Sequence, residues 1–221
     1  MLSIEIKRKL EATSENLEKN NIQAFIIDTK NEVVPLIKNL ISKGETVANG
    51  GSESLVQCGV IELLKNGNYN YLDRSLSTLT PQQKREIEIK TFGADTYFCS
   101  SNAITESGEL YNVDGNSNRV AAICYGPKSV IMVAGYNKIV KNIEEAIIRI
   151  KTISAPKNCE RLSCETYCKN VGKCVSINSD NHEMTSGCTT NARICCNYVV
   201  SAKQRHIHRI KVILVGDELG Y

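Results

Sequence analysis

Cysteines give this 221-residue chain its most evident capacity for chemistry, and seven of the ten fall between positions 159 and 196. Their spacing reads Cys164-x3-Cys168-x5-Cys174-x13-Cys188-x6-Cys195, with Cys159 upstream and Cys196 directly after. Thiolates gathered in this way bind zinc tetrahedrally or hold an iron–sulfur cluster. The spacing is neither the paired C-x2-C of a zinc ribbon nor the C-x2-C-x2-C run of a ferredoxin. Zinc, an iron–sulfur cluster and an irregular loop of structural or disulfide-bonded cysteines are therefore the alternatives.

The rest of the sequence favours intracellular thiol or metal chemistry over a disulfide framework. A chain of this length buries a substantial core without covalent staples. Its N-terminus is charged and lacks the apolar core of a signal peptide, and no run approaches the roughly 18 apolar residues of a membrane span. A net charge of +3, three Phe and no Trp give no support for nucleic-acid binding. We therefore expect a cytoplasmic protein without a membrane span or a nucleic-acid partner.

A second chemical feature is the run from Asn49 through Gly50 and Gly51 to Ser52, between a predicted strand and a predicted helix. Glycines let the backbone approach a ligand, and free N–H groups at the start of a helix favour negative charge. Ser52 can cap the helix and also donate to a phosphate or carboxylate. The run predicts an anion site, although a tight strand-to-helix turn needs glycine for backbone reasons just as often.

The run Ser100–Thr105 places small or polar side chains directly after another predicted strand, which favours a polar cleft at the strand end. Glu106 is the nearest carboxylate and the candidate general base or nucleophile, with a solvated hairpin glutamate as the alternative. Arg119 is predicted to pair a carboxylate in bidentate fashion. The other predicted ligand-binding residues of this surface are Ser100, Ser101, Asn102, Thr105, Asp114 and Asn118.

Helices that alternate with short apolar runs must position these residues. Helical patterns cover 3–20, 33–41, 56–66, 81–92 and 139–150, and apolar runs predict strands at 24–28, 46–48, 94–99, 120–125, 129–134 and 211–215. A turn at 105–109 predicts a hairpin. The alternation predicts an α/β fold, a mostly parallel sheet with helices on both faces. Pro156 is expected to close the last helix, so that an α/β domain over 1–156 precedes a cysteine-rich excursion over 157–198 and a final strand within 199–221.

Several motifs resemble the lactate-utilisation (LUD) domain family over nearly the whole chain. They are Gly50-Gly51-Ser52, Ala94-Asp95, Ser100–Thr105, Leu110–Gly115, Asn118-Arg119-Val120 and Tyr125-Gly126-Pro127. The stand-alone, cysteine-bearing branch of anaerobic bacteria is similar at Arg161-Leu162-x-Cys164, Gly172-Lys173-Cys174, Arg193-Ile194-Cys195 and the ending Ile213–Tyr221.

The resemblance bears on the metal ligands. Adjacent Cys195 and Cys196 cannot easily both face one metal, and Cys195 is the better candidate because its spacing to Cys188 belongs to the resemblance. That branch carries a further cysteine shortly after the Cys174 position, where this chain has a longer polar stretch, so a ligand is missing or replaced by His182. The predicted metal ligands are Cys164, Cys168, Cys174, Cys188 and Cys195.

The resemblance implies a fold related to ribose-phosphate isomerase, glucosamine-phosphate deaminase and coenzyme A transferase, with a ligand site at the strand ends. It implies a protein that binds a small anionic metabolite, such as a hydroxy acid, a keto acid or a phosphorylated compound, in lactate or other organic-acid utilisation beside an iron–sulfur protein partner. A second hypothesis is an accessory electron-transfer subunit. A third is a coenzyme A transferase or sugar-phosphate isomerase-like enzyme that uses Glu106. A homo-oligomer is compatible with each.

Overall fold

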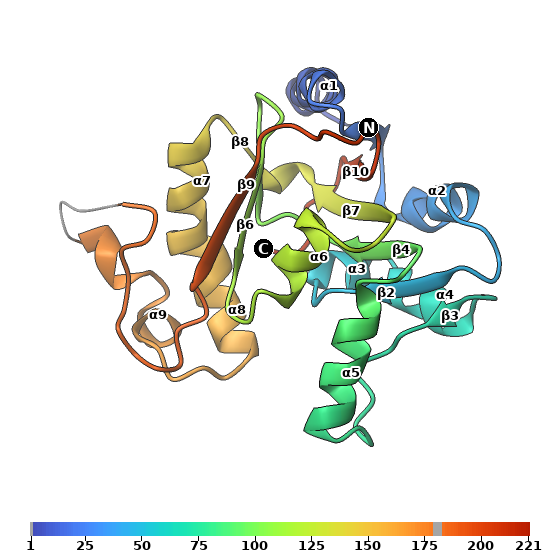
Figure 1. Cartoon of the computed structure of the whole chain (residues 1–221). Helices are drawn as coiled ribbons and strands as arrows, with labels where there is room; N and C mark the ends of the chain where they lie inside the picture. The colour runs from blue at the N-terminus through green and yellow to red at the C-terminus, as the bar shows by residue number, and fades with distance from the viewer. Residues whose placement is uncertain (1, 179–182) are drawn as a thin grey trace.

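The centre of the molecule is a six-stranded sheet in the order β1-β10-β7-β4-β2-β3, seen in a computed structural model that describes residues 2–178 and 183–221 (Figure 1). All of its strand pairings are parallel. The strands are β1 Gln23–Ile27, β2 Thr46–Asn49, β3 Asn70–Tyr71, β4 Thr96–Cys99, β7 Ser129–Gly135 and β10 Ile210–Val215. The predicted α/β fold with a mostly parallel sheet is confirmed.

Apolar side chains of these strands point to both faces of the sheet, and helices cover both. The covering helices are α1 Ile4–Lys19, α2 Val33–Leu40, α3 Glu53–Gln57, α4 Val60–Asn66 and α6 Asn118–Cys124. Helix α5 (Pro81–Thr91) is mostly exposed. Val212 and Leu214 of β10 pack in one cluster with α1 and α6. Ile213 and Val215 of the same strand pack in the other cluster, with α2, α3 and α4.

A second, four-stranded sheet lies beside the first in the order β8-β5-β6-β9. Its strands are β5 Ala103–Thr105, β6 Leu110–Asp114, β8 Ile139–Val140 and β9 Asn197–Ser201. The predicted hairpin is confirmed, since β5 and β6 pair in antiparallel fashion. Strand β9, which follows the cysteine segment, also pairs with β6 and so fastens that segment to the fold.

The helix that was expected to end at Pro156 continues past it, so that prediction is wrong. Helix α7 (Ile143–Arg149) runs through a π-helical turn at Ile150–Ser154 into α8 (Ala155–Arg161). The N–H of Ala155 donates to the Ile150 carbonyl, five residues back. This widened turn lets the chain take up a proline, which lacks an N–H, at the start of the next helical segment.

The predicted strand at 120–125 is also wrong, because residues 118–124 form helix α6. The Asp114 carboxylate accepts hydrogen bonds from the N–H groups of Arg119 and Val120 at the start of this helix. At its other end the Arg209 guanidinium donates to the Ile123 carbonyl at 2.7 Å. These side chains satisfy both helix ends, which an apolar run alone does not reveal.

Two other predicted helices are shorter than their patterns. Residues 56–66 are divided between α3 and α4 at Gly59, whose φ is +71°. Residues 139–140 form strand β8, and the helix begins only at Ile143.

The cysteine segment packs against the side of the second sheet that faces away from the first. It includes helix α9 (Tyr167–Val171) and a 3-10 turn at Val175–Asn178. Cys195 and Met184 contact a cluster that also contains Tyr111 of β6 and Ala146 of α7. In Figure 1 this segment forms the orange lobe beyond α7 and α8. No helix among the described residues is long and apolar enough to cross a bilayer.

Candidate functional site

A polar cleft of about 380 Å³ lies at the carboxyl ends of the strands in the large sheet. Gly51 and Ser52 follow β2, Ser100 follows β4, and Lys138 follows β7. The carboxyl ends of parallel strands meet at one edge of a sheet, and ligands of α/β proteins bind there. Helix α8 closes the cleft from the other side with Asn158 and Arg161.

Most of the predicted ligand-binding residues meet in this cleft. The residues that line it are Gly51, Ser52, Ser100, Ser101, Asn102, Asp114, Asn118 and Arg119. Gly50 lies behind its wall, and a side chain there would approach the Tyr97 hydroxyl to 2.7 Å, so its lack of a Cβ serves packing. The Ser52 hydroxyl accepts from the Leu55 N–H and caps α3, as predicted.

The structure places Thr105 and the candidate catalytic residue Glu106 outside the cleft. Thr105 is buried in the hairpin, where its hydroxyl lies 3.0 Å from Ser107 and from Glu109. Glu106 is exposed on the turn, and its backbone carbonyl accepts from the Asn16 side chain. The turn therefore points these two residues away from the other predicted site residues.

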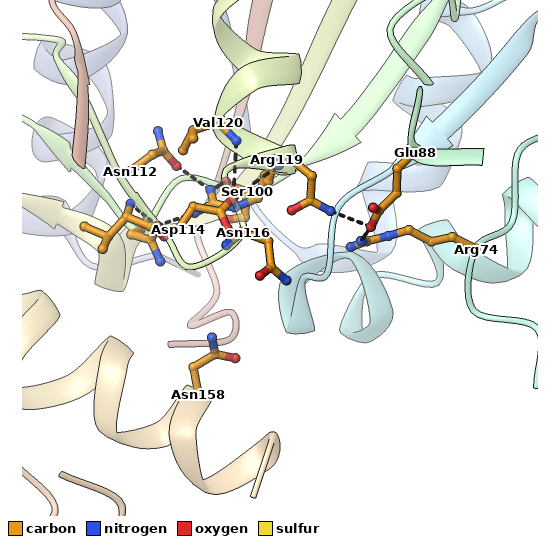
Figure 2. A network of polar contacts seen from close by, with 12 residues as sticks. Arg74, Glu88, Ser100, Asn112, Asp114, Asn116, Arg119, Val120 and Asn158 are labelled. Carbon is orange, nitrogen blue, oxygen red and sulfur yellow. Dashed lines mark hydrogen bonds and ion pairs between the residues drawn. The ribbon is translucent and has the colours of Figure 1, made fainter. Parts of the chain in front are cut away.

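Arg119 is held by the protein on every side (Figure 2). One guanidinium nitrogen donates to the Ser100 carbonyl and to Asn112 Oδ1, at 3.2 and 2.6 Å. The other donates to Asn102 Oδ1 and to the Val113 carbonyl, both at 2.7 Å. Because these bonds occupy its fork, Arg119 shapes the cleft wall, and a bidentate bond to a ligand would have to replace them.

Lys138 is a charged residue that sequence reasoning did not single out. It is 3% exposed, and its Nζ donates to the hydroxyls of Ser54 and Ser100 at 3.0 Å each. Across residues 2–178 and 183–221, no carboxylate forms an ion pair with it. Burial, and then the nearby Arg149 and Arg119, lower the pKa of Lys138 to about 7. A buried amine is thus held in the cleft without a counter-charge.

The charged side chains that line the cleft are predominantly basic. The basic residues are Arg74, Arg119, Lys138, Arg161 and Arg193, and the acidic residues are Glu53 and Asp114. Both carboxylates have partners in the protein: Glu53 lies 3.6 Å from Arg161, and Asp114 caps α6. The arrangement favours a negatively charged ligand.

A second, largely apolar cavity of about 30 Å³ lies between the second sheet, α8 and the cysteine segment. Five thiols line it, namely Cys159, Cys168, Cys174, Cys188 and Cys195. Four of these are predicted metal ligands. The fifth predicted ligand, Cys164, does not line the cavity, and Cys159 takes its place. His182 lies outside the described residues.

Two thiols of this cavity, Cys159 and Cys168, are buried, and those of Cys174, Cys188 and Cys195 are partly buried. Cys168 Sγ lies 3.6 Å from Cys159 Sγ. Burial raises the pKa of Cys195 to about 12, and the nearby thiols of Cys168, Cys174 and Cys188 also raise it. Arg193 donates to the carbonyls of Cys188 and Cys195, at 3.1 and 2.8 Å, and so fixes the loop that carries both.

The chemistry of the cavity lining fits a thiolate-bound metal group, but the positions of the side chains do not form a ligand set around one point. Several soft thiol donors face an apolar space beside Lys151 and Arg193, whose charges would offset those of thiolates. The Tyr111 hydroxyl, which is fully buried in the same lining, has no hydrogen-bond partner in the described structure. However, no three His, Cys, Asp or Glu residues of the described ranges are arranged to hold a metal ion. A volume of about 30 Å³ takes roughly two water molecules, so a cluster would require the loop around it to widen.

Comparison with known proteins identifies the family of this chain. The LUD domain model matches residues 10–215. The chain belongs to the LUD domain family. This family is associated with lactate utilisation. The LUD fold of this chain is similar to a crystal structure of a DUF162 family protein from Deinococcus radiodurans, with a TM-score of 0.50 and 12% sequence identity over 97% of this chain and 100% of the other. No curated protein matches the chain.

Sequence reasoning missed Arg74 and Asn158 of the cleft, which no motif marks, and three further residues of the two cavities of this LUD domain. Lys138 stands alone between two apolar runs and has no motif around it. Tyr111 follows the period of a strand and reads as core. Cys159 was visible in the cysteine spacing, but its position inside α8 was hidden by the expectation that the helix ends at Pro156.

Proposed function

We propose that this LUD domain protein binds a small organic anion in the cleft, with Lys138 as the charge at its floor. The observation that carries the proposal is a buried lysine that no described carboxylate neutralises. Burying a charge is costly unless it is paired, so an unpaired one in a cleft indicates that a ligand supplies the opposite charge.

The size and polarity of the cleft support the same proposal. Its volume of about 380 Å³ suits a small metabolite. Hydroxyl and amide groups of Ser52, Ser101 and Asn102 line it beside the cations and offer hydrogen bonds for a carboxylate or phosphate. A hydroxy or keto acid of the kind used in lactate metabolism satisfies these conditions.

The proposal is tested by thermal shift with lactate, pyruvate, a sugar phosphate and a coenzyme A ester. We expect at least one of these anions to raise the unfolding temperature of the wild type and not that of Lys138→Met. Lys128→Met is the matched control, because Lys128 is exposed and pairs with Asp95 at the opposite end of β7. Equal shifts in both variants, or no shift with any anion in the wild type, would contradict the proposal.

A second function is favoured by the five thiols around one cavity. We infer that Cys159, Cys168, Cys174, Cys188 and Cys195 supply the ligands of an iron–sulfur cluster or a zinc ion. A cluster would provide one-electron transfer, and zinc would fasten the loop. Because desolvation raises the pKa of the Cys195 thiol to about 12, metal binding there must release protons and should weaken as the pH falls.

Anaerobic purification followed by iron, zinc and sulfide analysis tests this second function. Metal is expected in the wild type and in Cys124→Ser, since Cys124 is exposed and outside the cavity. Cys174→Ser should lose it. Cys164→Ser separates the observed cavity from the predicted ligand set: it should retain the metal, whereas Cys159→Ser should not. Protein free of iron and zinc would refute this function.

The hypothesis of a transferase or isomerase that uses Glu106 gains no support from the position of this residue. An exposed glutamate on a turn outside the cleft has no access to a ligand bound beside Lys138.

A further inference from the structure

We propose that Lys138 is a nucleophile, and that it forms an imine with the carbonyl carbon of an oxo acid bound in the cleft. This inference rests on the proposed anion cleft and adds a covalent step to it. It narrows the ligand class to compounds that carry both a carboxylate and a ketone or aldehyde, such as pyruvate or glyoxylate.

The position of Lys138 is the first observation. The residue ends the turn Tyr136–Lys138, between β7 and β8, so strands of both sheets fix its backbone. Lys138 lines the cleft, and its Nζ donates to the hydroxyls of Ser54 and Ser100. Those hydroxyls donate to the Leu219 and Ser101 carbonyls at 3.3 Å each. They can exchange these long bonds for one to an oxygen that departs from the carbon attacked by Nζ.

The electrostatic surroundings are the second observation. Most lysines are protonated at neutral pH and do not attack carbonyls, and proteins activate a lysine by removing it from water or placing it beside another cation. Both conditions hold here, since Lys138 is buried and Arg149 lies nearby. Arg149 is itself occupied, because it donates to the Asn102 carbonyl and to Ser154 at 2.7 Å each. It acts as a fixed positive charge.

Hydrogen bonding around Nζ is the third observation. A lysine paired with a carboxylate is held as an ammonium ion, whereas hydroxyl partners tolerate both protonation states. Burial and the neighbouring arginines lower the pKa of Lys138, which favours the neutral amine with its free electron pair. The geometry therefore provides an amine in the cleft lining together with the means to bind the carboxylate of the substrate.

The reaction balances without an oxidant. The Nζ electron pair forms a bond to the carbonyl carbon, and one Nζ proton passes to the carbonyl oxygen to give a neutral carbinolamine. A second proton, taken from solvent, lets that oxygen depart as water while the nitrogen electron pair forms the C=N bond. The imine nitrogen keeps its remaining proton and is positively charged. The charge of Lys138 is thus retained and faces the carboxylate of the adduct, and the imine withdraws electrons from the neighbouring carbon.

Borohydride trapping tests the inference. The full-length protein is incubated with pyruvate or glyoxylate, reduced, and analysed by intact mass and by tryptic mapping. Reduction fixes the imine as a secondary amine, so we expect one adduct per chain and loss of tryptic cleavage after Lys138. The adduct should be lost in Lys138→Met and kept in Lys128→Met. Trapping should increase from pH 6 to pH 8, because the neutral amine is the attacking form.

The outcomes separate this inference from the proposed function. Stabilisation by pyruvate without an adduct at Lys138 would leave the anion cleft intact and overturn the imine. Adducts spread over exposed lysines, with none at Lys138, would do the same even if the Lys138→Met variant failed to fold, because they are read on the wild type. Absence of both stabilisation and adduct would overturn the proposed function together with the imine.

Discussion

Two basic residues of the cleft illustrate opposite ways of holding a cation below the surface. Arg119 donates to four acceptors of the protein, so its charge organises the wall made by β4, β6 and α6. Among the described residues, the partners of Lys138 are two hydroxyls, which solvate an ammonium ion without neutralising it. The first arrangement stabilises the fold, and the second lowers its stability in return for an anion site.

The free-energy cost of burying the Lys138 charge predicts that the stability of the protein depends on pH. Its pKa is about 7 in the folded state against 10.5 for an ordinary lysine. Below pH 7 both states are protonated and the cost of burial is fully present. Between pH 7 and about 10.5 only the unfolded state keeps the proton, so stability rises with pH by up to about 1.4 kcal/mol per unit.

Lys138→Met removes this dependence and should be more stable than the wild type, most clearly below pH 7. Urea unfolding at pH 6 and pH 9 measures the difference, which we expect to decrease at the higher pH. A difference of the same size at both pH values would show that the lysine is not buried as a charge.

Replacement of Arg119, in contrast to that of Lys138, is expected to destabilise the fold. Arg119→Lys keeps the charge but loses the planar fork, leaving oxygens of Asn102 and Asn112 without their donor. We expect a loss of about 2–4 kcal/mol in the free energy of unfolding, measured by urea denaturation. Arg8→Lys, on the exposed face of α1, should change it little. A loss equal to that of the control would contradict the structural role of Arg119.

At the level of elements, hydrophobic periodicity predicted the longer parts of the fold. Five of the six parallel strands and helices α1 and α2 follow from their apolar patterns, whereas α5 follows from the capping box of Thr80 and Gln83. Strand β3 was missed because its two residues, Asn70 and Tyr71, are too few for a period. The cleft follows from placing Ser52 and Ser100 at strand ends. Helix α6 was missed because its ends are satisfied by Asp114 and Arg209, which come from other parts of the chain. The second sheet was missed in part because β8 has only two residues, too few for a period.

The C-terminal segment that crosses the end of β7 yields a prediction at this scale. A methyl group at Gly135 would collide with the Asp217 carbonyl and lie 2.5 Å from the Leu219 nitrogen. Gly135→Ala must therefore displace residues 217–219, of which the Leu219 carbonyl accepts from Ser54, a partner of Lys138. We expect about 1–3 kcal/mol of destabilisation and a smaller thermal shift with the cleft anion.

Gly93→Ala is the control for this change, because an added methyl group there has no neighbour closer than 3.6 Å. Its unfolding temperature and its response to the anion should match those of the wild type. If Gly135→Ala behaves in the same way, the crossing segment does not support the cleft.

At the scale of the whole molecule, the polar cleft and the thiol cavity share a wall. Ile150, Ala155, Arg193, Ile194 and Cys195 line both. The sequence placed the two sites in separate segments, and the pairing of β9 with β6, together with bonds from Lys151 to the cysteine segment, brings that segment against the cleft. A charge introduced on one side of this wall must therefore change the electrostatic potential on the other side.

This shared wall predicts that metal binding weakens anion binding. Metal binding replaces neutral thiols by thiolates whose summed charge exceeds that of the metal ion, while the charges of Lys151 and Arg193 are present with and without metal. The potential in the cleft therefore becomes more negative, and the affinity for an anion such as pyruvate should fall several-fold, a coupling of roughly 1 kcal/mol. Calorimetric titration of pyruvate into zinc-free and zinc-loaded protein, with bound zinc measured on the same samples, gives the coupling. By linkage, pyruvate should weaken zinc binding by the same factor. Cys174→Ser, which lacks a thiol of the cavity but none of the cleft, should show one affinity for pyruvate under both conditions. Equal affinities in the zinc-loaded and zinc-free wild type would mean that the two cavities act independently despite their common wall.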